Sequence, residues 1–494
     1  MGSDWIDCEL GDLIELKRGY DLPKTKRVNG GVPVVSSSGS SGEHNEIKVK
    51  APGVVTGRYG TIGEVFYIED DFWPLNTTLY VKNFKGNDPL FVYYFLKTIR
   101  YSDYTDKGAV PGINRNHIHK AKVKVPVDPI YQRNLALKLY DLDSKIQLNQ
   151  KTNQTLEQMA QALFKSWFVD FDPVFDNLLA SVDFKLDNLE GSLPDELKHK
   201  AQRRLAALNS LENATQCKAS LSALAHELQA QLPTKEATQA AVQVSEKAAE
   251  TPVKANFNAN PDILAQHANT HAHFPNEFEH NEQLGWIPKG WSATSVEDEF
   301  VVKGGSTPST KNPDFWEGGE IHWTSPKDLS GNTTKIMLDT SRKITSAGLK
   351  KITSGLLPID TVLMSSRAPV GYLALAKVPV AINQGYIAIT DAKTLSSEYT
   401  IQWLDSVMDE IKGISGGTTF AEISKKTFKS IQLVIPSKKA VEAYTEVTKM
   451  YYERITASVQ EINTLTETRD YLLPKLISGE LQIPDVATDD ETVD

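Results

Sequence analysis

The chain has 494 residues, which is too long for one ordinary domain and predicts two to four of them. With 40% hydrophobic and 23% charged residues it has the composition of a soluble globular protein. No apolar stretch is long enough for a membrane span, and the N-terminus lacks the basic and apolar segments of a signal peptide. The two cysteines, Cys8 and Cys217, have no metal-binding spacing and favour a reducing compartment, so we expect a cytoplasmic protein.

The net charge of −10 is unusual for a protein that binds nucleic acid, but its distribution matters more than its sum. Residues 485–494 hold five acids and no base, and so supply half of it. Residues 1–126 hold 17 Lys and Arg against 15 Asp and Glu, and residues 284–436 hold 16 against 15. Both segments are near neutral, so their charge permits DNA binding without arguing for it.

The first part of the chain is predicted to be rich in β-structure and to lead into a long helix. Residues 32–35, 54–56 and 64–68 are short strand-like runs between Gly and Ser turns, and residues 90–100 form one amphipathic helix. From Pro129 onward, seam residues recur at alternating steps of three and four, which is the heptad spacing of a coiled-coil helix. The seam residues are Leu135, Leu139, Leu142, Ile146, Asn149, Asn153, Leu156, Ala160, Leu163 and Trp167.

Residues 180–283 have no counterpart after the long helix of the second half of the chain. Within them, residues 195–231 have helical periodicity. Residues 234–273 are polar and poor in aromatic side chains, which predicts a flexible linker. We therefore expect an insertion that is partly helical and partly flexible.

The second half of the chain repeats the first at an offset of about 310 residues. The matching segments are Trp5 with Trp291, 54–58 with 363–367, 76–77 with 383–384, and 113–126 with 423–436. Further strands are predicted at 321–324, 361–364 and 386–389, a short helix at 397–411, and a second long helix from about Lys438. This helix keeps the same heptad spacing, with the seam residues Val441, Tyr444, Thr448, Tyr451, Ile455, Ser458, Ile462, Leu465, Arg469, Leu472 and Leu476. The period far exceeds the 20–50 residues of a solenoid repeat, so it indicates a duplicated half-molecule.

Each long helix has about 40 residues and would be about 60 Å long. A coiled-coil arm that dimerises two chains is one interpretation. Two such helices within one chain favour an internal antiparallel pair, whose register Asn149 and Asn153 would fix at some cost in stability.

Seven sequence phrases carry a resemblance to a known family. They are 284–291 (LGWIPKGW), 304–309 (GGSTPS), 315–323 (FWEGGEIHW), 343–345 (KIT) with 348–349 (GL), 357–363 (LPIDTVL), and the helix ends 163–173 (LFKSWFVDFDP) and 472–481 (LLPKLISGEL). In their order and duplication they resemble the DNA-specificity subunits of type I restriction–modification systems, over the whole chain except about 100 linker residues. The first copy departs from this pattern because it lacks the FW…GE phrase, and the first helix starts after Val127-Asp128 where the family often has Pro-Pro.

The resemblance implies an α+β fold, with two β-rich target-recognition domains joined by two long antiparallel coiled-coil helices in a pseudo-two-fold repeat. It implies a non-catalytic subunit that binds a bipartite, asymmetric site in double-stranded DNA and scaffolds two methyltransferase subunits and motor-nuclease subunits. The complex would methylate adenine N6 and cut DNA with ATP. No cofactor is expected on this chain, while S-adenosylmethionine, ATP and Mg would belong to its partners. The expected segments are recognition domain 1 (1–127), spacer helix 1 (128–172), the insertion (173–283), recognition domain 2 (284–436), spacer helix 2 (437–480) and an acidic tail (481–494).

Recognition of bases needs side chains such as Arg, Asn and Gln that reach the groove edges. Arg58 and Arg367 follow an apolar strand at matching points, and the basic residues before the last strand of each domain are expected to contact phosphates. Surface ion pairs and turn caps are the alternative roles. The expected DNA contacts are Lys17, Arg18, Arg58, Asn76, Thr77, Arg115 and His117 in the first domain, and Lys303, Ser306, Thr307, Arg367, Asn383, Gln384, Lys425 and Lys426 in the second.

Two other functions stay open: a single-chain DNA modification enzyme with a degenerate site, and a DNA-free coiled-coil adaptor. Residues 312–315 come nearest to the base-gripping motif of an adenine methyltransferase, but Asp314 replaces its second Pro, which favours a simple turn. The sequence has no phosphate-binding Gly-x-x-x-x-Gly-Lys-Ser/Thr loop. The histidine pairs at 117–119 and 271–273 lack further ligands, so we expect surface or linker histidines and no metal site.

Overall fold

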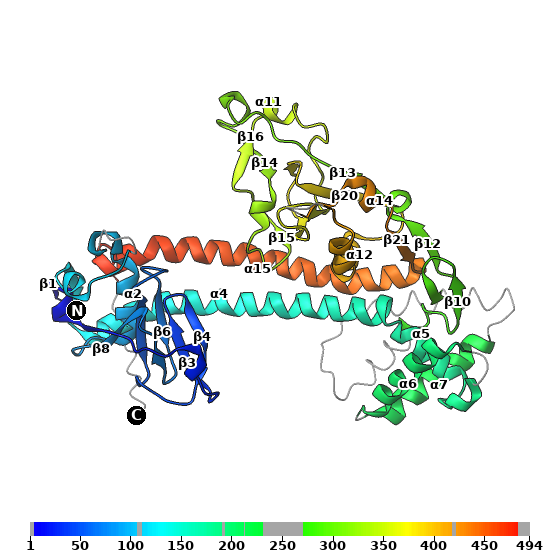
Figure 1. Cartoon of the computed structure of the whole chain (residues 1–494), viewed down its shortest axis with the longest axis horizontal. Coiled ribbons are helices and arrows are strands. Elements are labelled where there is room, and N and C mark those ends of the chain that lie inside the picture. The colour runs from blue at the N-terminus through cyan, green and yellow to red at the C-terminus, as the bar shows by residue number, and fades with distance from the viewer. Residues whose placement is uncertain are drawn as a thin grey trace, which may run out of the picture. The chain divides into compact units, whose positions relative to one another are not determined.

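The computed structural model describes residues 4–105, 111–189, 193–211, 213–230, 270–416 and 421–482. The chain divides into two compact units, Met1–Gln150 with Glu461–Asp494, and Lys151–Gln460. Each unit contains one β-rich domain and part of each of the two long helices (Figure 1).

The two long helices are α4 and α15. Helix α4 spans Pro129–Phe164 and continues as a π-helical turn over Lys165–Val169, and α15 spans Lys438–Ser478. The predicted seam positions of α4 are buried or half-buried along its whole length. The heptad spacing therefore placed this helix and its buried face correctly.

Contacts within each unit show that α4 and α15 run antiparallel. In the first unit, Asn149 Nδ2 donates to Glu461 Oε2 at 2.9 Å, and Arg469 lies 2.7 Å from Asp143. Residues with higher numbers in α4 therefore contact residues with lower numbers in α15. In the second unit, the Tyr444 hydroxyl donates to the carbonyl of Ala160 at 3.2 Å. The predicted internal antiparallel pair is confirmed, and Asn149 is one of its polar links.

The first β-rich domain contains two sheets and a two-stranded ribbon. The antiparallel sheet has the order β2-β8-β5-β6, the smaller sheet β4-β3-β7 includes a parallel β3–β7 pair, and the ribbon pairs β1 with β9. The strands are β1 (Trp5–Glu9), β2 (Glu15–Arg18), β3 (Val32–Ser36), β4 (Gly39–His44), β5 (Gly53–Gly57), β6 (Val65–Ile68), β7 (Trp73–Pro74), β8 (Thr78–Asn83) and β9 (Lys122–Pro126). The helices are α1 (Leu10–Leu13), α2 (Pro89–Thr98) and α3 (Arg115–Ile118), with 3₁₀ turns at Lys24–Lys26 and Tyr101–Tyr104.

The second β-rich domain repeats this topology. Its larger sheet has the order β13-β20-β17-β18-β15, its smaller sheet is β16-β14-β19, and β12 pairs with β21. The strands are β12 (Ser292–Ser295), β13 (Phe300–Lys303), β14 (Ile321–Thr324), β15 (Ile336–Met337), β16 (Arg342–Ile344), β17 (Thr361–Ser365), β18 (Leu373–Ala376), β19 (Ala381–Ile382), β20 (Tyr386–Ala392) and β21 (Gln432–Ile435). The helices are α10 (Val296–Glu299), α11 (Ser346–Leu349), α12 (Ser397–Ser406), α13 (Met408–Gly413) and α14 (Lys425–Lys429), with 3₁₀ turns at Pro313–Phe315 and Pro326–Leu329.

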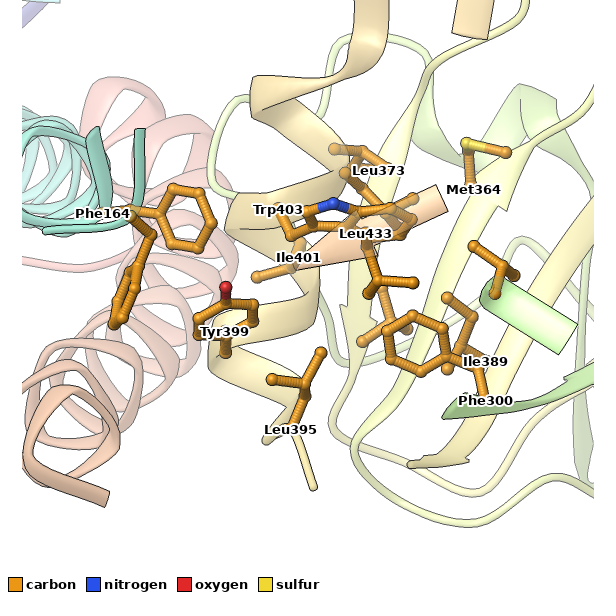
Figure 2. Packing of buried hydrophobic residues seen from close by; sticks show 14 of the residues in the cluster. Phe164, Phe300, Met364, Leu373, Ile389, Leu395, Tyr399, Ile401, Trp403 and Leu433 are labelled. Carbon is orange, nitrogen blue, oxygen red and sulfur yellow. The ribbon is translucent and has the colours of Figure 1, made fainter. Parts of the chain in front are cut away.

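Each domain packs one helix between its larger sheet and the long helices. The central strands β5 and β17 are buried at every position, as expected of strands covered on both faces. In the second domain, α12 packs against β17 and β18, and Figure 2 shows its Tyr399 beside Phe164 of α4 while Trp403 lies among the residues from the sheet. The domain core and the long helices therefore form one continuous apolar cluster in this unit.

The insertion contains a small helical core of its own. Helices α5 (Asp172–Ser181), α6 (Asp195–Asn209) and α7 (Ala214–Ala230) pack together and against the hairpin of β10 (Phe278–Asn281) and β11 (Gly285–Pro288). A further 3₁₀ turn spans Leu186–Leu189. The helical part of the expected insertion is thus present, whereas most of the expected linker, residues 231–269, lies outside the described residues.

The expectation for His271 was wrong. Its side chain is buried rather than in an exposed linker, and its Nε2 lies 2.9 Å from Asp176 Oδ2. Arg204 binds the same buried carboxylate through two 2.7 Å hydrogen bonds. Burial alone would raise the pKa of Asp176, but donation from Arg204 and His271 holds it below its usual value. The segment that precedes the second domain is therefore attached to α5 through the contact of His271 with Asp176.

Candidate nucleic-acid interface

In the first domain, three loops that carry predicted DNA contacts meet at Arg58. Its backbone N–H donates to the carbonyl of Thr77 at 2.9 Å, and its own carbonyl accepts from Ile113 N at 3.1 Å. The guanidinium lies 4.5 Å from the ring centroid of Tyr59, and its Nε donates to the Ile113 carbonyl at 3.4 Å. The end of β5, the turn before β8 and the loop before α3 are thus held together.

Two further candidate DNA contacts of the first domain, Asn76 and Arg18, both interact with Asp21, which the sequence analysis did not single out. Asp21 accepts a hydrogen bond from Asn76 Nδ2, and it also lies 3.4 Å from Arg18. The neighbouring Lys17 has its Nζ 5.5 Å from the ring centroid of Tyr20. Since Asp21 uses part of the hydrogen-bonding capacity of both Asn76 and Arg18, DNA would have to compete with it for these side chains.

The short helix α3 presents Arg115 and His117 on the surface, as predicted. The next histidine, His119, differs from the surface histidine that we expected. It is half-buried, and its Nε2 accepts a hydrogen bond from the backbone N–H of Leu16 at 2.9 Å. Burial and the nearby Arg115 and Lys85 lower the pKa of His119, so the ring is neutral at pH 7 and joins α3 to β2.

In the second domain, the same crossing of three loops is built around Ser366. Its N–H donates to the carbonyl of Gly385 at 2.8 Å, and its carbonyl accepts from Ile423 N at 3.0 Å. The residue in the structural place of Arg58 is therefore Ser366, and not Arg367 as the matched sequences suggested.

Arg367 instead occupies the place of Tyr59. It forms an isolated β-bridge with Glu422, just as Tyr59 does with Gly112, and Glu422 and Gly112 are 310 residues apart. Its guanidinium lies 3.8 Å from the carboxylate of Glu422, and the side chain is 37% exposed. The arginines of the two domains thus lie at adjacent, non-equivalent positions of the same loop.

Four further predicted residues of the second domain are close together. The Thr307 hydroxyl donates to Gln384 Oε1 at 2.8 Å, and Ser306 N donates to the carbonyl of Ile382 at 3.1 Å. Asn383 caps its own turn, because its Oδ1 accepts from Gly385 N at 2.8 Å. Thr307 and Gln384 are both exposed, so this pair is open to a ligand, whereas Asn383 has a structural role in the turn.

The predicted lysines also come together. Lys303 pairs with Ala388 in the register in which Lys17 pairs with Tyr80, so the two lysines occupy the same place in β13 and β2. Lys425, exposed in the first turn of α14 with Lys426, lies over Gly304, where an added Cβ would be 2.8 Å from its Nζ. The glycine therefore makes room for a lysine beside Lys303.

Among the described residues, no group of three or more His, Cys, Asp or Glu side chains is arranged to hold a metal ion. In the same part of the chain, no helix is long and apolar enough to cross a membrane. What the geometry offers is a set of Arg, Lys, Asn, Gln, Ser and Thr side chains at corresponding loops of two domains. Such side chains donate to phosphates and to base edges.

Comparisons with known proteins match both β-rich domains to one family. The family described as "Type I restriction modification DNA specificity domain" matches residues 2–158 and 288–467, which is more than half of the chain and includes both β-rich domains. The HindI specificity subunit of Haemophilus influenzae is 26% identical over 97% of this chain and 100% of its own length. The MjaIX specificity subunit of Methanocaldococcus jannaschii is 34% identical over 37% of this chain and 43% of its own.

A solved structure supports the fold. The S subunit of a type I restriction–modification system from M. genitalium aligns with a TM-score of 0.53 and 13% identity, covering 98% of this chain and 97% of that one. At this identity the likeness concerns the fold alone. The duplicated domains, the paired helices and the two family matches together identify the chain as a member of the type I restriction–modification specificity subunits, the non-catalytic subunits of their complexes.

Proposed function

We propose that each β-rich domain binds one half of a bipartite, asymmetric site in double-stranded DNA, through the loops that meet at Arg58 in the first domain and at Ser366 and Arg367 in the second. The observation that carries this proposal is the recurrence of one loop crossing, with basic and amide side chains around it, in two domains of the same topology. The 15 residues predicted from the sequence are candidates for these contacts.

The paired helices then act as a spacer and as a platform for two methyltransferase subunits, to which motor-nuclease subunits add. S-adenosylmethionine, ATP and Mg belong to those partners, and the assembled complex methylates adenine N6 and cuts unmodified DNA in the cytoplasm. This part rests on the family, together with the length of α4 and α15. Co-purification of the full chain with its methyltransferase at two copies per chain tests it.

The DNA-binding proposal is tested by expressing the full chain with the methyltransferase subunit of its own host and a plasmid library of random sequences. The methylated adenines and their flanking sequences are then mapped. We expect Arg58→Ala and Arg367→Ala to relax base preference in different halves of the site, because each side chain belongs to a different domain. Loss of a bidentate guanine contact costs about 1–3 kcal/mol of discrimination.

Matched controls are Lys122→Ala and Lys429→Ala, which remove ion-paired lysines, one from each domain, that are not among the candidates. Both should leave the methylated motif unchanged. Equal weakening of every sequence by both arginine variants would assign them to phosphates only. A wild-type complex that methylates without sequence preference would overturn the proposed function itself.

A further inference from the structure

The second domain holds an exposed arginine whose orientation is fixed by aromatic rings. Arg342, the first residue of β16, has its guanidinium carbon 3.5 Å from the ring centroid of Trp316 and 5.4 Å from that of Trp323. The two indoles meet edge to face at 5.0 Å. A guanidinium this close to an indole makes a cation–π contact with that ring, which restricts the orientation of the side chain while the residue stays exposed.

This arginine has no acidic partner within ion-pair distance among the described residues. Asp339, three residues earlier, is engaged instead by His322 at 3.0 Å and by Lys343 at 3.4 Å. Lys343 is the next residue of β16, so its side chain belongs to the opposite face of the strand. The charge of Arg342 is therefore held in place by stacking and is not neutralised by a neighbouring carboxylate.

The backbone that carries Arg342 is also fixed. The Thr340 hydroxyl donates to the carbonyl of Arg342 at 2.7 Å, and Ser341 N donates to Asp328 Oδ1 at 3.1 Å. Burial alone would raise the pKa of Asp328, but donation from Ser325 and Ser341 lowers it, so the acceptor stays charged. These contacts hold the backbone from which the side chain of Arg342 extends.

The aromatic support of Arg342 leads directly to the candidate DNA contacts. Trp323 Nε1 donates to the carbonyl of Ser306 at 3.4 Å, and Trp316 Nε1 donates to that of Ser309 at 3.0 Å. Between these two residues lies Thr307, whose hydroxyl is bonded to Gln384. The loop that carries Thr307 and the stack that carries Arg342 are thus one connected structure.

We propose that Arg342 is a specificity-determining residue of the second recognition domain and makes a bidentate contact to a guanine in the half-site that this domain binds. The inference rests on the proposed function and adds a residue to it. A planar fork of donors matches the O6 and N7 acceptors of guanine, although it can also bind two oxygens of a phosphate. The contact with Trp316 limits the directions in which the fork can point, and the connected loop carries Thr307, which is bonded to Gln384, so we assign Arg342 to a base edge.

The test uses the same complex and random-sequence library. Arg342→Ala should lower the preference for guanine at one position of one half-site by about tenfold or more, and leave the other half-site unchanged. Arg342→Lys should fail to restore that preference. Trp316→Leu, which keeps an apolar side chain against Trp323 but removes the indole beneath the guanidinium, should relax the same position to a smaller extent.

Lys343→Ala is the matched control, because it removes a cation from the adjoining position of the same strand, and it should leave the motif unchanged. An unaltered motif in Arg342→Ala overturns the inference. So does a loss of methylation that is equal for every sequence, whether or not Arg342→Lys restores it, because such a loss marks a phosphate contact. Either result, obtained with a wild-type complex that methylates selectively, leaves the proposed function standing, whereas an unselective wild type removes the proposed function instead.

Discussion

The two recognition domains share a topology, yet they are attached to the long helices by different means. In the first unit the domain core and the long helices share an apolar cluster that includes Leu135 and Leu139 of α4 and Ile477 of α15, and directed polar contacts are added to it. The Tyr94 hydroxyl of α2 donates to Asp143 Oδ2 at 2.7 Å, and Arg469 of α15 holds the other carboxylate oxygen at 2.7 Å. Gln132 of α4 donates to Asn87 Oδ1 at 2.8 Å and to the Pro126 carbonyl at 2.7 Å.

In the second unit the attachment is mainly aromatic. Phe164, Phe168, Tyr399 and Tyr444 are all buried, with ring centroids 4.8–6.0 Å apart where they meet. Burial raises the pKa of Tyr444 well above its ordinary value, so its hydroxyl stays protonated and acts as a donor.

The polar part of this second attachment is less complete. Gln402 Nε2 donates to Glu157 Oε1 at 2.9 Å and to the Tyr452 hydroxyl at 2.7 Å, and Lys335 lies 2.8 Å from the same carboxylate. However, Glu157 Oε2 and Gln402 Oε1 are buried without a hydrogen-bond partner from the described residues. Both domains are thus packed on the long helices through apolar clusters. The comparison teaches that the first attachment adds hydrogen-bonded polar contacts, whereas the second relies more on aromatic rings and leaves two buried polar atoms unpaired within the described residues.

If packing holds the second domain, removing one ring should cost the most. We expect Phe168→Ala to lower the free energy of unfolding by about 3–5 kcal/mol, because it opens a cavity among rings that cannot all close in. Chemical denaturation measures the loss, and hydrogen exchange of α12 locates it. A loss below about 1 kcal/mol would show that the aromatic cluster is not what fixes this domain.

If the polar contacts help to hold the first domain, a weaker acceptor at Asp143 should lower the stability of that unit. Asp143→Asn takes the charge from a carboxylate that serves both Tyr94 and Arg469, and should cost about 1–3 kcal/mol of stability. The control is Tyr94→Phe, which removes one of the two bonds. The effects of the two substitutions should be less than additive in the double variant, and strict additivity would contradict a shared network.

The smallest expected effect concerns pH and again separates the domains. His119 accepts a backbone hydrogen bond only when neutral, and its pKa is lowered in the fold, so its stabilising contribution is present above pH 6.5 and is lost as the pH falls below that value. At the matching place, 310 residues on, the second domain has Lys429. His119→Gln keeps an acceptor that does not titrate, so unfolding at pH 7.5 and 5.5 should show a smaller loss in the variant than in the wild type.

Most of the architecture could be predicted because it depends on periodicity. Heptads placed α4 and α15, and short apolar runs placed β3, β5, β6, β14, β17 and β20 to within a few residues. The burial of Tyr452 was not predicted. This residue of α15 lies next to the heptad seam, and its hydroxyl contacts Gln402 of α12, 50 residues earlier in the chain.

The candidate site was predicted less well, for two physical reasons. The sequence alignment matched Arg58 with Arg367 because both are arginines. The backbone register, which is set by the ends of β5 and β17, instead makes Ser366 the residue equivalent to Arg58. Arg342 was not singled out, since nothing in the local sequence shows that the indole of Trp316, 26 residues earlier, lies beneath it. Contacts between segments that are distant in the sequence determine which polar side chains are oriented for binding.

The ribbons β1–β9 and β12–β21 have a consequence for how such proteins change. Trp5 is paired with Pro126, and Ser292 with Ile435, so the chain enters and leaves each recognition domain through adjoining strands. The segment between the two strands of each ribbon therefore begins and ends at the same place in the fold. The second strand of each ribbon, β9 or β21, continues directly into a long helix. Each domain is therefore a cassette. Under the proposed function, exchange of the enclosed segment would change only the half-site bound by that domain and would leave the long helices unaltered.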